Sequence, residues 1–80
     1  MNKKPDILEI VKEDILEALE EKNGQAPASL LEPEIKVSRS FISKAIKELE
    51  KENLIRIKRN LVYLTKEGIK KAKDIVKKHL

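Results

Sequence analysis

The chain has 80 residues, enough for one domain with a modest core, so residues 1–80 are expected to fold as a single domain. It has no cysteine and one histidine, which leaves no disulfide, no thiolate site and no cluster for a transition metal, and we expect neither metal nor cofactor. No stretch is apolar over the length of a membrane span and no apolar signal core follows Met1, which predicts a cytoplasmic protein without a membrane partner. Abundant Ile, Lys and Glu, with no Cys or Trp, are typical of a thermophile.

The net charge of +4 conceals two halves of opposite sign. Residues 1–35 carry four basic and nine acidic side chains, a formal charge of −5, whereas residues 36–80 carry fourteen basic and five acidic side chains, a formal charge of +9. A polyanion should therefore meet the C-terminal half first, with the acidic half facing away from it. The alternative is that the lysine-rich helices merely keep the chain soluble.

A first helix is expected from Asp6, whose carboxylate can cap it, to about Lys22, because Asn23-Gly24 ends it. Its core stripe would consist of Leu8, Val11, Ile15, Ala18 and Leu19. Ile7 and Ile10 lie to one side of this stripe and widen the apolar face. The surplus suggests a second partner surface.

Residues 25–28 should be extended, because Pro27 disfavours helical angles at the residue before it. Ser29 and Glu32 then offer a capping box for a second helix. The apolar residues of that helix would be Leu30, Leu31 and Ile35. Since Pro33 is tolerated only in or near a first turn, the second helix must be short.

The most informative stretch is a helix predicted over residues 38–52, with Ser38 as N-cap and Val37 pointing into the core just before it. The inward face is Ile42, Ala45, Ile46 and Leu49, at i, i+3, i+4 and i+7. The outward face gathers small polar, aromatic and basic side chains, namely Arg39, Ser40, Phe41, Ser43, Lys44 and Lys47. Such a mixture suits hydrogen bonds to base edges and phosphates, so it predicts a recognition helix for the major groove of double-stranded DNA.

Residues 54–64 change to a period of two after Asn53, a residue suited to the left-handed position that ends a helix. With Arg59-Asn60 as a two-residue turn, the facing pairs are Ile55 with Leu64, Arg56 with Tyr63, Ile57 with Val62 and Lys58 with Leu61. The buried face would then be Ile55, Ile57, Val62 and Leu64. This pattern predicts a β-hairpin, although Arg-Asn also allows a loop that is one residue longer.

A last helix is expected from its cap at Thr65 through His79. Its apolar stripe would be Ile69, Ala72, Val76 and Leu80, with Ile75 beside it. Gly68 in the first turn is a poor helix former, which a close approach of this turn to the hairpin or to the first helix would explain. His79, near the helix C-terminus, fits a helix-dipole or solvent residue better than a metal ligand.

Two segments resemble known regulators. VSRSFISKAIKELEKENLI over residues 37–55 resembles the recognition-helix region of bacterial and archaeal regulators, and LTKEGIKKA over residues 64–72 resembles the strand-to-helix junction of MarR-type and iron-dependent repressor families. The order helix, extended piece, helix, helix, hairpin, helix is that of a winged helix-turn-helix domain, which is mainly α with a small β-hairpin.

The resemblance implies roles for individual residues. The positions that usually enter the major groove would be Arg39, Ser40, Phe41, Ser43, Lys44 and Lys47. The wing over residues 56–63, with Arg56, Lys58 and Arg59, would touch the DNA backbone or minor groove. Phe41 stands where such helices commonly carry Thr or Ser, so its ring would either contact a thymine methyl or fold back onto the short second helix.

The leading hypothesis is a sequence-specific double-stranded DNA-binding protein, a small transcriptional regulator that acts as a homodimer because one short helix reads few base pairs. The dimer interface would be Ile7, Ile10, Ile75, Val76 and Leu80. The alternative is a protein-protein interaction module of a larger assembly. Catalysis is not expected, because the sequence lacks a glycine-rich phosphate loop and a nucleophile constellation, and it shows no room for a small-molecule ligand.

Overall fold

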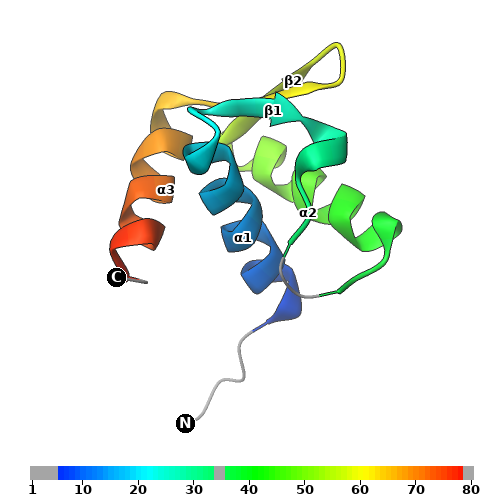
Figure 1. Ribbon diagram of the computed structural model, residues 1–80. Coiled ribbons are helices and arrows are strands. Elements are labelled where there is room, and N and C mark those ends of the chain that lie inside the picture. Colours follow the sequence, from blue (N-terminus) through cyan, green and yellow to red (C-terminus); the bar gives the residue numbers. More distant parts are fainter. Residues whose placement is uncertain (1–5, 34–35, 79–80) are drawn as a thin grey trace, which may run out of the picture.

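The computed structural model describes residues 6–33 and 36–78. The elements in chain order are α1 (Ile7–Glu21), β1 (Gln25–Pro27), the 3-10 turn η1 (Ala28–Leu30), α2 (Arg39–Lys51), β2 (Ile55–Lys58), β3 (Leu61–Leu64) and α3 (Lys66–Lys78). In Figure 1, α1 lies between α3 and α2, and the sheet lies across one end of the three helices. This part of the chain is mainly α with a small antiparallel sheet, as expected, but it holds three α-helices instead of four.

α1 has the limits that its capping residues predict. Asp6 accepts a hydrogen bond from the backbone N–H of Leu8 at 3.0 Å, and at the other end Asn23 adopts a φ of 64°. The N–H of Gly24 then donates to the carbonyl of Leu19 at 2.7 Å, which closes the helix end. The fully buried apolar residues of α1 are Val11, Ile15, Leu16 and Leu19, while Leu8 and Ala18 pack against the core at its edge. The predicted stripe omitted Leu16.

The prediction of a second α-helix after Ser29 is wrong for the described residues. A single 3-10 turn occupies Ala28–Leu30 and no side chain caps it. Residues 31–33 and 36–38, which are described between this turn and α2, have no regular structure. Pro33 explains the difference, because a proline disfavours helical angles at the residue before it and so stops an α-helix from forming through Glu32. Leu31 nevertheless reaches the core, with an exposed fraction of 1%, whereas Ile35 lies outside the described residues.

α2 begins and ends as its sequence predicts. The hydroxyl of Ser38 accepts a hydrogen bond from the N–H of Phe41 at 3.2 Å. At the C-terminus Asn53 adopts a φ of 62°, and the N–H of Leu54 donates to the carbonyl of Leu49 at 3.0 Å. The face predicted to be inward is confirmed, since Ala45, Ile46 and Leu49 are buried, while Ile42 and the preceding Val37 pack against the core.

The hairpin has the predicted register. β3 is the central strand of the sheet, β2 pairs with it as Ile55 with Leu64 through Lys58 with Leu61, and β1 pairs on its other side. Arg59 and Asn60 have φ values of 51° and 67°, so the connection is the two-residue turn that suits twisted strands. One assignment is wrong, because Ile57 is 41% exposed. It lies close to the tip, and the hairpin tip extends past the helices in Figure 1.

α3 is capped by Thr65, whose hydroxyl accepts a hydrogen bond from the N–H of Gly68 at 3.0 Å. The close approach predicted at Gly68 is confirmed, because an added Cβ would collide with the carbonyl of Leu54. The buried residues of α3 are Gly68, Ala72 and Ile75, so the helix is rotated from the predicted orientation and Ile69 is 39% exposed. His79 and Leu80 lie outside the described residues.

Lys12 is the one charged side chain that is buried among the described residues, with an exposed fraction of 6%. Its ammonium lies 2.7 Å from a carboxylate oxygen of Glu52, at the end of α2, and 3.1 Å from one of Glu9. Burial alone would lower the pKa of Lys12, but the hydrogen bonds and charges of Glu52 and then Glu9 outweigh it and raise the pKa above its usual 10.5. The ion pair therefore ties α1 to the C-terminal end of α2.

The raised pKa predicts that Lys12 stabilises the fold at neutral pH and loses this contribution in alkali. A raised pKa in the folded state means that the contribution is complete below the unfolded pKa near 10.5 and disappears as the pH rises through the folded value. We therefore expect the free energy of unfolding of the natural chain, measured relative to Lys12→Met, to be constant from pH 6 to about pH 9 and to fall above about pH 10.5. Urea unfolding at each pH measures this difference, and a difference that stays constant up to pH 11 would contradict the assigned direction.

Candidate nucleic-acid interface

The outer face of α2 is a shallow groove lined by polar and basic side chains. It has a volume of about 410 Å³, and its lining residues are Ser40, Ser43, Lys44, Lys47, Glu48 and Lys51. Four of these, Ser40, Ser43, Lys44 and Lys47, are residues that the sequence assigned to the DNA-contacting face. Lys51 was not assigned to this face from the sequence. The signal that identifies it is its position one turn after Lys47, on the same side of the helix.

Charge on this face is available to a ligand. Lys44, Lys47 and Lys51 are all exposed. Within residues 6–33 and 36–78, the ion pairs are those that Lys12 makes with Glu9 and Glu52. None of these lysines makes an ion pair with a described carboxylate, although Glu48 lines the same groove. An anion that approached α2 would meet three ammonium groups along less than three turns of helix.

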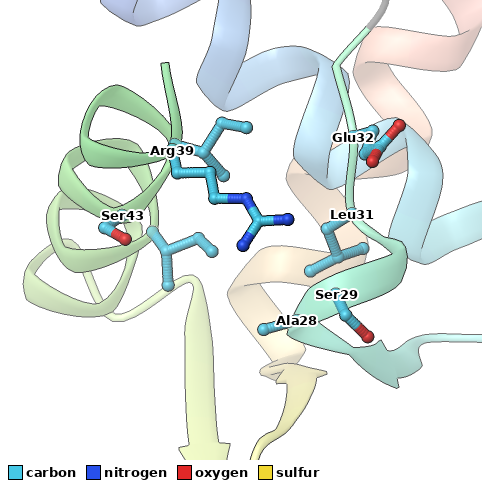
Figure 2. A pocket seen from close by; sticks show the side chains of 8 residues that line it. Ala28, Ser29, Leu31, Glu32, Arg39 and Ser43 are labelled. Atoms are coloured by element: carbon cyan, nitrogen blue, oxygen red, sulfur yellow. The ribbon is translucent and has the colours of Figure 1, made fainter. Parts of the chain in front are cut away.

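Arg39 lies apart from the groove. Its side chain extends from the first turn of α2 over a hollow of about 260 Å³ between this helix and the segment from Ala28 to Glu32. Figure 2 shows the guanidinium directed across this hollow toward the segment that carries Leu31, with Ser43 on the α2 side. Arg39 thus borders the edge of the outer face, at the place where the predicted second helix is replaced by the 3-10 turn.

Phe41 takes one of the two positions that the sequence left open. It is half-buried and packs against the hydrophobic core. Its place on α2 explains this, since it precedes Ala45 by one turn and Ala45 is fully buried. The ring therefore contributes to packing, although it contacts the core and not a second α-helix.

The basic residues of the wing lie at the tip and at the base of the hairpin. Lys58 and Arg59 are exposed at the tip of the hairpin. Arg56 is exposed at the base, where with Tyr63 and Lys66 it lines a depression of about 330 Å³ between the sheet and the start of α3. In Figure 1 the hairpin tip and α2 lie on the same side of α1, and α3 lies on the other side.

Two contacts hold the C-terminal end of α2 in place. The first is the ion pair between Lys12 of α1 and Glu52. The second is made by the hydroxyl of Thr65, which donates a hydrogen bond to the carbonyl of Asn53 at 2.7 Å while it caps α3. Because Asn53 and Thr65 flank the hairpin, the second contact also fixes the base of the wing relative to α2.

The residues named for a dimer interface are not all available at a surface. Ile75 is 1% exposed within a single chain, so its assignment to an exposed apolar patch is wrong. Ile7 is 55% exposed, whereas Ile10 and Val76 are half-buried. Leu80 lies outside the described residues.

The described residues contain no group of three or more His, Cys, Asp or Glu side chains that could hold a metal ion. In the same part of the chain, no helix has the length and apolar character needed to cross a membrane.

The fold is similar to that of a solved protein. No family model and no curated protein matches the sequence. The crystal structure of a candidate transcriptional regulator from Pseudomonas aeruginosa PA01 matches with a TM-score of 0.71 and 23% sequence identity. The match covers 92% of this chain and 54% of that chain, so this chain spans about half the length of that protein. The likeness, the three-stranded sheet and the helix order show that the chain has a winged helix-turn-helix fold, with its second helix reduced to a 3-10 turn.

Proposed function

We propose that this chain is a sequence-specific double-stranded DNA-binding protein that regulates transcription. The observation that carries the proposal is the outer face of α2, where Ser40 and Ser43 lie among three exposed lysines that make no ion pair with a described carboxylate. The similarity to a candidate transcriptional regulator supports the same function.

The dimensions of α2 suit the major groove. An α-helix with its side chains is about 10–12 Å across, and the major groove of B-DNA is about 12 Å wide. In this arrangement the hydroxyls of Ser40 and Ser43 face base edges, and Lys44, Lys47 and Lys51 lie close to phosphates. The lysines supply affinity that depends on salt, and the serines contribute to the choice of sequence.

The wing extends the contact along the duplex. Lys58 and Arg59 at the hairpin tip would contact the backbone or the minor groove, and Arg56 would contact the backbone from the hairpin base. A short cationic tip carries little sequence information, so this contact would add affinity for all duplexes alike. The anchored ends at Asn53 and Thr65 keep the wing and α2 in a fixed relation, which lets one duplex meet both.

Selection from random DNA duplexes tests the proposed function. We expect a short duplex sequence to be enriched, and we expect log K for that sequence to fall linearly with log salt, with a slope of about −0.9 for each phosphate contact. A control duplex of scrambled sequence should bind more weakly with a similar slope, since phosphate contacts do not depend on sequence. Failure to retain any duplex at low salt would remove the proposal.

We further propose that the chain acts as a symmetric homodimer through one end of α1 and α3. The exposed Ile7 and the half-buried Ile10 and Val76 would form the apolar contact. Burying such a patch contributes about 25 cal/mol per Å² of apolar area, which would stabilise a domain with a small core. Two copies of α2 would also read more base pairs than one copy.

Sedimentation equilibrium at tens of micromolar protein should give twice the monomer mass, and Ile10→Asp should give the monomer mass. Ile57→Asp provides a matched control, because Ile57 is 41% exposed near the hairpin tip, outside the proposed contact, and its replacement should leave the dimer intact. A natural chain that sediments as a monomer would exclude the homodimer while leaving the DNA-binding proposal in place.

A further inference from the structure

A second basic surface runs along α3. Four lysines of this helix follow one another at intervals of four, three and four residues. We call them the α3 stripe: Lys66, Lys70, Lys73 and Lys77. Residues at these intervals lie above one another on one side of a helix, and all four side chains are exposed. Glu67 and Asp74, the acidic residues of α3, lie beside the stripe at three or four residues from Lys70 and Lys77, but neither makes an ion pair with a lysine of the stripe. The stripe is therefore a continuous row of positive charge about 16 Å long.

The α3 stripe lies on a different side of the molecule from the outer face of α2. α1 separates the two helices, as Figure 1 shows, and each packs its buried residues into the common core. The exposed faces of α2 and α3 consequently lie on different sides of the molecule. A duplex seated on α2 and the wing would reach the stripe no farther than Lys66, which lines the same depression as Arg56. The proposed function therefore leaves Lys70, Lys73 and Lys77 without a partner.

The composition of the α3 stripe differs from that of α2 in an informative way. The outer face of α2 mixes serines with lysines, whereas the stripe holds lysine alone. Like charges at intervals of three and four residues weaken a helix, and a merely solvated face can avoid this by alternating lysine with glutamate. Within the described parts of the chain, no carboxylate pairs with any of the four. A row of ammonium groups without readout side chains matches a regularly spaced polyanion.

We propose that the α3 stripe binds the phosphate backbone of a second DNA duplex, so that one chain holds two duplexes together. The inference rests on the proposed function, which supplies the first duplex at α2. B-DNA carries about one negative charge per 1.7 Å of axis, so a row of roughly 16 Å meets enough phosphates to pair every lysine. Contact through lysine alone is independent of base sequence.

Two geometric considerations favour simultaneous binding. Packed helices lie about 8–10 Å apart, so the axes of α2 and α3, with α1 between them, are separated by roughly 15–20 Å. This exceeds the Debye length of about 8 Å at physiological salt, so repulsion between the two duplexes is largely screened. The apolar contact proposed for a homodimer uses Val76, about a quarter turn of α3 away from the stripe, and leaves the lysines free.

A duplex-capture assay tests the inference on the full chain. Beads carrying an immobilised duplex of the selected sequence are mixed with protein and a fluorescent duplex of unrelated sequence, and the captured fluorescence is measured. The natural chain should capture the second duplex. Replacing Lys70, Lys73 and Lys77 by Gln should abolish capture while the affinity for the selected duplex stays within about threefold, because Gln and Lys have similar helix propensities and α2 is untouched. The matched control replaces Lys22, Lys71 and Lys78, which are exposed outside the stripe, by Gln and should capture normally.

The outcomes separate the two proposals. A chain that binds the immobilised duplex but never captures the second one overturns the α3 inference alone. Capture that persists in the stripe variant overturns it too, since a homodimer with two copies of α2 would then be the bridge. Loss of capture in both variants points to overall charge and overturns it as well. A lower sedimenting mass in the stripe variant would assign the lysines to a protein contact instead. Failure to bind any duplex removes the proposed function, and the inference with it.

Discussion

Gly68→Ala is expected to cost about 3 kcal/mol of folding free energy, the upper end of the usual cost of overpacking and a large part of the stability of a domain this small. The Cβ of alanine would collide with the backbone carbonyl of Leu54, which already accepts a hydrogen bond from the N–H of Thr65 at 3.0 Å. Relief requires the first turn of α3 to move away from the end of α2. That movement breaks the two hydrogen bonds that Thr65 donates to the end of α2, from its hydroxyl to the carbonyl of Asn53 and from its N–H to the carbonyl of Leu54. The gain in helix propensity, about 1 kcal/mol, is too small to compensate.

Urea unfolding followed by circular dichroism measures this loss, and Gly24→Ala is the control. Gly24 has a φ of 91°, but no atom lies within 4 Å of an added Cβ, so this variant bears only the backbone cost of a left-handed residue, about 1–2 kcal/mol. We expect the midpoint of Gly68→Ala to fall well below that of Gly24→Ala. Equal midpoints would mean that α3 can move away from Leu54 without loss, in contradiction to the tight junction described here.

The hairpin and α2 could be predicted from sequence because local signals agree there with the tertiary structure. Alternating apolar residues and the Arg59-Asn60 turn select one register, and a shift by one residue would bury Lys58 or Arg56. Ser38 and Asn53 mark the ends of α2 by local hydrogen bonds that need no distant partner. Elements of this kind are defined within one stretch of chain.

The rotation of α3 could not be predicted, because its apolar residues fit two overlapping stripes. One stripe contains Ile69 and Val76, and the other contains Gly68 and Ile75. The contact between Gly68 and the carbonyl of Leu54 selects the second, and this contact joins residues far apart in the sequence. The same limit applies to Lys12. Its burial depends on Glu52, forty residues away, while the sequence pattern places any lysine at the surface.

The candidate site was predicted in part for a related reason. Helical periodicity brings Ser40, Ser43, Lys44 and Lys47 to one face, and the structure places all four along one groove. Periodicity cannot tell whether a residue at the edge of that face turns toward the core or toward solvent. Phe41 turns inward because the core continues beneath the first turns of α2, and Arg39 extends over the hollow that the missing helix leaves.

Replacing Lys44, Lys47 and Lys51 together by Gln is expected to weaken binding of the selected duplex by about 100-fold at physiological salt. Each lysine that neutralises a phosphate contributes about 0.9 to the salt slope, so the slope should fall by roughly 2.7 when three contacts are lost. Electrophoretic mobility shift or fluorescence anisotropy over a range of salt concentrations measures both quantities. The fold should be unaffected, because all three side chains are exposed and Gln has a helix propensity close to that of Lys.

Two further variants serve as controls for this experiment. Replacing Lys22, Lys71 and Lys78 by Gln removes the same charge away from α2 and should leave the slope within one unit, so any larger effect there would indicate general charge and not a defined face. Ser43→Ala removes no charge, and it should change which sequences are selected with little effect on the slope, since a hydroxyl at a base edge carries readout. If the α2 triple variant binds with unchanged affinity and slope while remaining folded, the outer face of α2 is not the surface that meets DNA. In that case the wing residues Lys58 and Arg59, or the α3 stripe, would have to account for the binding.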